Sequence, residues 1–319
     1  MDFEKLTSEK IKKKAIELGA DLVGVCTANA INEHPPDPRW PQTADKIWRE
    51  CRSVVAIAKR IPWGSVRQDD KLSRTYPPTL VMARLDEIAL DLSYYIEAQG
   101  GCASPAPQQI TDTALKKGAY GPLSLRHVAV EAGIGTLGLN MMLVTPEFGP
   151  RVYLTAVLTD LELEYDVPLS KSQCLGPACG RCLLGCPGDA VEHWYLNKKR
   201  CSEHAQKFGV PSLIDFMSKV ISEPSLEKRQ LMLTGTDFLN YWQALRSGSQ
   251  SYAGCLSCWQ ACPVGKDYPS HFKDKFANLE NIPDSREEKR KSMVLQESSG
   301  ESKGYFEHSR RWIGEKLQD

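Results

Sequence analysis

Apolar and polar positions in the first hundred residues alternate between helical and strand spacing. Residues 7–19 have helical spacing after the capping-box-like stretch TSEK, and residues 21–28 (DLVGVCTA) form an apolar run of strand length. Residues 53–61 (SVVAIAKRI) are rich in β-branched side chains and predict a second buried strand. Residues 79–101 predict a long amphipathic helix that ends at its two final glycines.

The next segment mixes a helix with a predicted hairpin. Residues 121–133 have Pro near the start and Gly at the end, which is typical of a helix. Two strand-like stretches, residues 139–145 and 151–163, flank the turn PEFGP at 146–150 and predict a hairpin by composition. This order favours an α+β core over a doubly wound sheet.

A change of composition near residue 166 predicts the domain organisation. Residues 1–165 form the first domain, and residues 166–270 are rich in Cys, Gly and Pro. The second domain carries a helical insert of two helices at about 205–250, whose aromatic residues we expect in a core. Residues 271–319 form a charged C-terminal arm, and we interpret its basic run as a solvated face on a partly disordered or surface-lying segment.

Charge and hydropathy exclude several classes of protein. The 319 residues carry 40 Lys plus Arg and 40 Asp plus Glu, and zero net charge argues against a large non-specific nucleic-acid footprint. No run of 18 apolar residues is present, and the N-terminal stretch has neither an apolar signal segment nor a twin-Arg pair. We therefore expect a cytoplasmic protein without a membrane partner.

Cysteine spacing is the strongest chemical signal. A reducing cytoplasm disfavours disulfides, so eleven cysteines favour metal binding or catalysis. The pattern C-x2-C-x3-C-P occurs twice and is the core of bacterial ferredoxin sequences, in which the Cys before Pro ligates the other cluster. With two further cysteines the chain offers eight thiolates for two 4Fe–4S clusters: Cys174, Cys179, Cys182 and Cys262 for one, and Cys186, Cys201, Cys255 and Cys258 for the other.

Two features of this ligand set leave alternatives open. Zinc also binds C-x2-C pairs, although zinc sites do not call for a third Cys followed by Pro. Four residues separate Cys174 from Cys179 where the usual ferredoxin run has two, which makes Cys174 the least certain ligand. Two clusters form a path for electrons, and the residues before them are the expected site of chemistry.

Gly133, Gly135 and Gly138 have the G-x-G-x-x-G spacing of a dinucleotide-binding turn. That fingerprint requires a strand before the first Gly and a helix after the last, whereas here a helix precedes and a strand follows. Binding of NAD through these glycines is therefore disfavoured. A helix C-cap followed by a tight turn, or a close approach of the backbone to a large ligand, explains them better.

The stretch AGIGTLGLNMMLVTPEFGPRVYLTAVLTDLEL, followed by the two-cluster cysteine pattern, resembles the cobalamin-dependent reductases that comprise epoxyqueuosine reductase and the reductive dehalogenases. PEFGPRV is more similar to the dehalogenase branch. The resemblance implies a nitroreductase-like α/β sandwich that holds a base-off cobalamin, followed by a ferredoxin-like domain. It also implies cofactor contacts from the residues around the glycine turn and hairpin, namely Gly133, Gly135, Gly138, Asn140 and Arg151.

Departures from the family pattern concern the proton donor. Ala119 aligns with the acidic residue of epoxyqueuosine reductases, and Tyr120 stands one position from the expected place of the dehalogenase Tyr. Tyr120 is therefore the candidate acid, with packing in a turn as the alternative. The resemblance predicts a reductase that cleaves a C–X or C–O bond of a small molecule. Two alternatives stay open: a corrinoid-free electron-transfer protein, and an epoxyqueuosine reductase acting on tRNA.

Partners follow from the same interpretation. We expect an external low-potential electron donor of the ferredoxin or flavodoxin type and a small-molecule substrate. Neutral charge makes tRNA an unlikely partner. The sequence leaves open whether the chain forms a homodimer.

Overall fold

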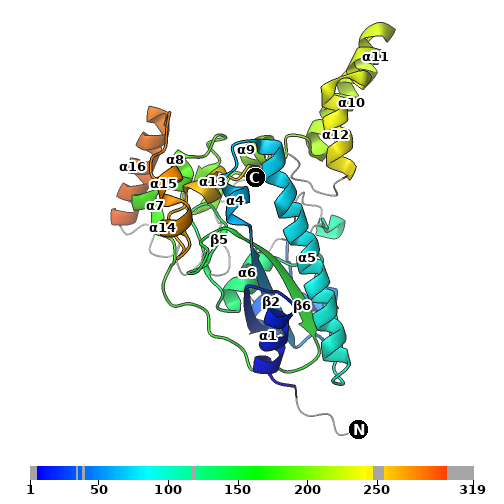
Figure 1. Ribbon diagram of the computed structural model, residues 1–319, viewed down its shortest axis with the longest axis vertical. Helices are drawn as coiled ribbons and strands as arrows, with labels where there is room; N and C mark the ends of the chain where they lie inside the picture. Colours follow the sequence, from blue (N-terminus) through cyan, green and yellow to red (C-terminus); the bar gives the residue numbers. More distant parts are fainter. Residues whose placement is uncertain are drawn as a thin grey trace.

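The computed structural model of the chain shows a helix-covered sheet next to a cysteine-rich region (Figure 1). None of the described helices is long and apolar enough to cross a membrane. The structure describes residues 6–33, 35–37, 40–108, 110–115, 120–246 and 255–299.

The centre of the first domain is an antiparallel four-stranded sheet in the order β1-β2-β6-β3. Val25 lies opposite Val55, and Val55 lies opposite Val157, so these side chains share one face. Both faces are apolar and buried, which explains why β1 and β2 were readable as continuous apolar runs. Antiparallel pairing agrees with the predicted α+β core. The strands are β1 (Leu22–Thr27), β2 (Ser53–Arg60), β3 (Ala103–Pro105) and β6 (Val152–Thr159).

Helices cover both faces of this sheet. The face that carries Val55 packs against α1 and α5. The opposite face packs against α6, which approaches the sheet so closely that a Cβ at Gly24 would lie 2.1 Å from the carbonyl oxygen of Ala132. The helices of the first domain are α1 (Ser8–Glu17), α2 (Ala28–Asn32), α3 (Ala44–Ile47), α4 (Trp63–Arg67), α5 (Lys71–Glu97) and α6 (Leu125–Glu131), with the 3₁₀ turn η1 (Thr113–Leu115).

Helix α5 begins earlier than the predicted range 79–101. Asp70 caps the helix by accepting a hydrogen bond from a backbone N–H of the first turn. Pro77 and Pro78 both lie inside the helix, and Pro78 has no N–H for the carbonyl of Arg74. The Ser65 hydroxyl, 3.5 Å away, donates to that carbonyl instead. A tertiary contact therefore compensates for a proline that the local sequence reads as a boundary.

The predicted hairpin is confirmed only at its turn, where Thr145 and Gly149 form an isolated antiparallel bridge, because the stretches 139–145 and 151–163 do not pair as strands. The first segment contributes only β5 (Leu143–Val144), which pairs with β4 (Thr136–Leu137), while the second forms β6 in the main sheet. The turn between them is also bonded to the cysteine-rich region, through the N–H groups of Lys266 and Asp267.

The cysteine-rich region packs on the first domain through a shared apolar core. Leu183, Val191 and Trp194 belong to the same buried cluster as Val128 and Leu137. The region is built from short elements: α7 (Gly176–Cys179), α8 (Arg181–Leu184), β7 (Val191–Glu192), β8 (Tyr195–Leu196), α9 (Lys198–Ala205), α13 (Ser257–Ala261), α14 (Tyr268–His271) and α15 (Lys273–Phe276).

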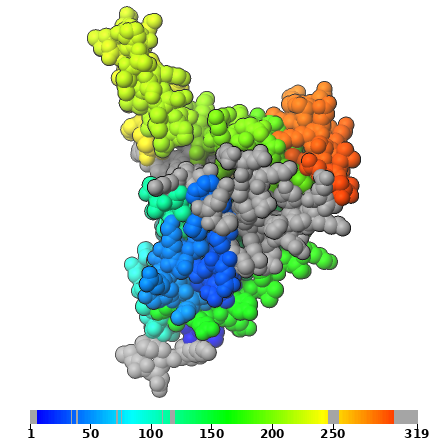
Figure 2. Space-filling view, turned by 180° about the vertical axis from the view of Figure 1, so that it is seen from behind, coloured from blue at the N-terminus to red at the C-terminus, as the bar shows by residue number. Residues whose placement is uncertain are grey.

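The insert projects from the body as a helical arm (Figures 1 and 2). Its described residues form three helices rather than two: α10 (Val210–Ser222), α11 (Leu226–Thr234) and α12 (Thr236–Arg246). Phe216 and Tyr241 are buried as expected, but Phe238 and Trp242 are exposed. Residues 247–254 lie outside the described residues.

Helix α16 (Asp284–Ser299) corrects the interpretation of the charged C-terminal arm. It packs on α7 and α8, and its cationic side chains bond to that region instead of facing only solvent. Arg286 donates to the carbonyl of Leu184, and Arg290 donates to the carbonyl of Ala178. Residues 300–319 of the predicted arm lie outside the described residues.

Candidate functional site

The structure brings cysteines of both motifs close to one another, and Cys182 has thiol neighbours from both predicted groups. In the first group, burial and then the charges of neighbouring thiols raise the pKa of Cys182 well above its usual range. In the second, burial and then the charges of Cys186 and Cys255 raise the pKa of Cys201 to about 11. The members of the first group are Cys174, Cys179, Cys182 and Cys262; those of the second are Cys186, Cys201, Cys255 and Cys258.

The second group fits a cluster of several atoms. Its four cysteines line one cavity of about 270 Å³. Among the described residues, no three His, Cys, Asp or Glu side chains converge closely enough for a single metal ion. Burial raises the pKa of Cys258, so a bound cation is needed to stabilise its thiolate near neutral pH. Assignment of the eight cysteines as cluster ligands stays a prediction that this arrangement supports.

The two cysteine motifs lie directly against each other. Gly180 adopts φ +56°, and this left-handed residue joins α7 to α8 between Cys179 and Cys182. Arg181, which follows it, donates from Nε to the carbonyl of Ala261 over 2.9 Å. Because Ala261 precedes the last cysteine of the second motif, this hydrogen bond brings the motifs together.

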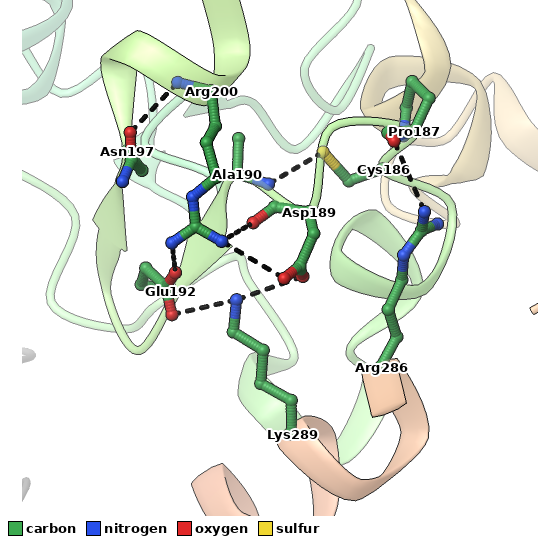
Figure 3. Close-up of polar contacts among 9 residues, drawn as sticks. All are labelled: Cys186, Pro187, Asp189, Ala190, Glu192, Asn197, Arg200, Arg286 and Lys289. Atoms are coloured by element: carbon green, nitrogen blue, oxygen red, sulfur yellow. Dashed lines mark hydrogen bonds and ion pairs between the residues drawn. The ribbon is translucent and has the colours of Figure 1, made fainter. Parts of the chain in front are cut away.

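An ion-pair network holds the loop that contains Cys186 (Figure 3). Arg200 pairs with Asp189 over 3.2 Å and also with Glu192. Lys289 of α16 reaches the same two carboxylates over 3.1 and 2.9 Å. Arg200 directly precedes Cys201, so the network fixes the mutual position of two members of the second group.

Arg151 was predicted to contact the cofactor, but the structure gives it a different role. Its side chain is 1% exposed and pairs with Asp267, which is 3% exposed, at 2.6 Å. The guanidinium also donates to the carbonyls of Trp259, Cys262 and Val264. Every N–H of the group thus has an acceptor. Arg151 anchors the segment that carries Cys262 and is not among the described lining residues of the cysteine cavity or of the Tyr120 cavity, so its contact with a cofactor stays a prediction.

The turn before Arg151 docks on the same segment. The backbone N–H groups of Lys266 and Asp267 donate to the carbonyls of Pro146 and Glu147 over 3.1 and 3.2 Å. Gly149 has φ +55°, and a Cβ there would lie 2.0 Å from the carbonyl oxygen of Val264. Only glycine permits this contact, so PEFGP works as a docking loop.

The three glycines of the G-x-G-x-x-G stretch pack against the protein itself. Gly133 has φ +71° and ends α6, as a C-cap does, and its Cβ would lie 2.7 Å from the carbonyl oxygen of Val167. A Cβ at Gly135 would lie 2.5 Å from the carbonyl oxygen of Val144, and one at Gly138 would lie 2.8 Å from a methyl group of Val144. Their assignment to cofactor binding stays a prediction, because these contacts explain them without a ligand.

Asn140 reaches the second cysteine group. It is 4% exposed, accepts a hydrogen bond from the N–H of Met142 over 3.2 Å, and lines the cavity of the four cysteines. A hydrogen bond from its side chain also moderates the raised pKa of the Cys258 thiol. Asn140 is therefore placed to contact a bound cluster.

A second cavity, of about 440 Å³, adjoins the first and contains Tyr120 in its wall. The ammonium of Lys198 lies 3.5 Å from the centre of the Tyr120 ring, and Trp40 packs at 6.0 Å. Arg126 and His127, at the start of α6, line the same cavity. Ala119 lies outside the described residues.

Sequence reasoning missed several residues of these walls. Tyr153 lines both cavities, packs edge-on against Trp259 at 5.3 Å, and has its pKa raised to about 12 by burial. Strand alternation could have found it, because Tyr153 lies two residues after Arg151 in extended chain, and such residues point to the same side. No sequence pattern marked Lys198 or Trp259 as a cavity residue, because the positions of both depend on the docking of distant segments.

The chain has homologues in two groups of curated reductases. It is 27% identical to a tetrachloroethene reductive dehalogenase of Desulfitobacterium hafniense over 275 residues, which cover 64% of this chain and 46% of that protein. It is 40% identical to an epoxyqueuosine reductase of Bacillus cereus over 152 residues, which cover 47% of this chain and 32% of that protein. The chain thus spans about half the length of the dehalogenase and a third of the length of the epoxyqueuosine reductase. The predicted resemblance to both branches is confirmed. No protein-family model matches.

Solved structures show the same mixed α/β fold. A catabolic reductive dehalogenase superposes with a TM-score of 0.51 at 20% identity, covering 81% of this chain and 39% of that chain. It has also been solved in complex with 3-bromo-4-hydroxybenzoic acid. An epoxyqueuosine reductase with a tRNA stem loop superposes with a TM-score of 0.50 at 21% identity, covering 90% and 80%. With tRNA-modifying enzymes among the relatives, the expectation that tRNA is not a partner is unsupported.

Replacing Arg151 with Met should strongly destabilise the protein. The variant leaves Asp267 buried without its cation, a change that costs about 3–5 kcal/mol. Urea unfolding of the two proteins measures the difference in the free energy of unfolding. Arg67→Gln is the matched control, because Arg67 pairs with the exposed Asp274 and should change stability far less. Equal effects of both variants would refute the anchoring role.

Replacing Lys289 with Ala should loosen the second cysteine group. Loss of a half-buried ion pair to Asp189 and Glu192 should speed the chelator-driven release of iron by about two- to fivefold. Absorbance of a ferrous chelate follows the release. Lys291→Ala, on the exposed side of the same helix, should leave the rate unchanged. Identical rates for both variants would contradict the network's role.

Proposed function

We propose that this chain is an oxidoreductase that uses two 4Fe–4S clusters and a base-off corrinoid to cleave a C–X or C–O bond reductively. The observation that carries the proposal is that the cavity of the second cysteine group adjoins the cavity of Tyr120. The two cavities share five lining residues: Met82, Met142, Tyr153, Leu196 and Trp259. Electrons delivered to the cysteine groups would therefore arrive beside the space where a substrate binds.

The proposal assigns each region a task. When bound, the clusters would relay single electrons and the corrinoid would supply a low-potential cobalt centre. The first domain corresponds to a nitroreductase-like cobalamin-binding domain, and the cysteine-rich region corresponds to a ferredoxin-like domain. A ferredoxin or flavodoxin type donor would supply the electrons. The reduced thiols that the clusters require suit the cytoplasm.

Tyr120 is the proposed proton donor. Its phenol lies in the wall of the larger cavity, and the ammonium of Lys198 packs on its ring. A positive charge at this distance stabilises the phenolate that remains after proton transfer. Arg126 adds a second cation in the same wall.

Epoxyqueuosine reduction on tRNA is the second candidate function. It is favoured by the epoxyqueuosine reductases among the relatives, including the one solved with a tRNA stem loop. The acidic residue expected for that reaction is Ala119 in this chain, so a different acid would be needed. Reduction of epoxyqueuosine in a tRNA stem loop, assayed beside debromination of 3-bromo-4-hydroxybenzoate, separates the two candidates.

Anaerobic reconstitution tests the cofactors. Incubation with iron, sulfide and hydroxocobalamin should give about eight irons and one corrinoid per chain, with a base-off absorption spectrum. Cys258→Ala should lose about half of the iron, whereas Cys102→Ala should lose none, because Cys102 is exposed and outside both groups. Incorporation of iron with loss of cobalamin on washing would favour the corrinoid-free electron-transfer alternative.

Tyr120→Phe tests the acid. Loss of the hydroxyl should lower the turnover number by about 10²- to 10⁴-fold while iron and corrinoid contents stay unchanged. Turnover is measured with chemically reduced protein, which removes the electron donor as a variable. Tyr94→Phe, at an exposed position of α5, is the matched control. Unchanged turnover in Tyr120→Phe would remove this residue from the mechanism.

A further inference from the structure

His127 is a buried imidazole with one nitrogen unused. Its side chain lines the larger cavity and the residue is 6% exposed. Nδ1 lies 2.7 Å from the hydroxyl oxygen of Ser124, but Nε2 has no hydrogen-bond partner among the described residues. Buried polar atoms are nearly always paired, so an unpaired one on a residue that lines a cavity has room for a water or ligand as its partner.

The imidazole is neutral under ordinary conditions. Burial, followed by the charges of Arg126 and Lys198, lowers the pKa of His127 to about 3. A neutral imidazole carries one N–H. When the Ser124 hydroxyl donates to Nδ1, that N–H is at Nε2, so a residue of the cavity lining carries a donor without a protein acceptor among the described residues.

The charge of the wall selects the kind of ligand. Arg126 and Lys198 are the cations among the described lining residues, and Asp37 is the carboxylate, which leaves an excess of one positive charge. Glu131 lies one helical turn beyond His127 and is not among the described lining residues. A surplus of positive charge beside a free N–H favours an oxygen atom with negative charge.

We propose that His127, together with Arg126 and Lys198, binds an anionic oxygen of a small-molecule ligand in this cavity. A carboxylate or phenolate on the substrate supplies such an oxygen. Tyr120 lies in the same wall, so an anchored substrate would be held beside the proposed acid. The inference deepens the proposed function and rests on it for the reaction, but binding alone tests the anion site.

Calorimetric titration with sodium benzoate tests the proposal, with benzamide as the uncharged analogue. The reconstituted wild-type protein should bind benzoate at least tenfold more tightly than benzamide. His127→Phe should weaken benzoate binding by about 10- to 100-fold, as expected for a lost hydrogen bond to a charged group. His127→Gln retains a donor and should recover part of the affinity. Iron content reports whether each variant folds.

A second variant keeps the test independent of the buried histidine. Lys198→Met alters α9 at the cavity and should also weaken benzoate binding, whereas Lys207→Met, at an exposed position outside the cavity, should not. Benzoate affinity that is equal in the wild type, His127→Phe and Lys198→Met would overturn the proposal.

The phosphate of a corrinoid nucleotide tail is the other source of an anionic oxygen. Uptake of cobalamin is therefore compared with uptake of cobinamide, which lacks that phosphate. If the variants weaken uptake of cobalamin alone, the site binds the cofactor phosphate and the assignment to a small-molecule ligand is overturned. A wild-type protein that takes up no corrinoid but still binds benzoate would refute the proposed function and leave the anion site standing.

Discussion

The buried pair of Arg151 and Asp267 is the contact on which the arrangement of the two regions depends. Arg151 directly precedes β6, the strand that lies between β2 and β3. Its guanidinium is bonded to the backbone on both sides of Cys262. Because a buried cation and carboxylate each require the other, separating the regions would leave two unpaired charges. The sheet and the cysteine groups are therefore positioned as one unit.

This coupling gives the two cavities a common wall. Tyr153 lies two residues after Arg151 and meets Trp259, whose carbonyl accepts from Arg151. Any shift of the cysteine segment would therefore move the aromatic pair at the junction of the cavities. The contacts of Arg151, Tyr153 and Trp259 therefore set the position of the cysteine groups relative to the cavity of Tyr120.

The local sequence predicted those features of the fold that depend on residues close together in the chain. β1, β2 and α1 follow from apolar spacing, and the proximity of the two cysteine motifs follows from the ferredoxin pattern. Contacts over long separations were not accessible. Arg151 reaches a segment more than a hundred residues away, and the basic residues of α16 read as a solvated run until their carboxylate and carbonyl acceptors are known. The start of α5 was missed because Ser65 compensates for a proline through a tertiary hydrogen bond.

The order of the cysteines along the chain has a consequence for the projecting arm. Each cysteine group combines residues from before the arm with residues from after it, so the arm lies within a loop whose two ends are held together. Changes in the length of such a loop cost little once its ends are fixed. Helices α10 to α12 are thus a place where a change in length would cost little loop-closure entropy.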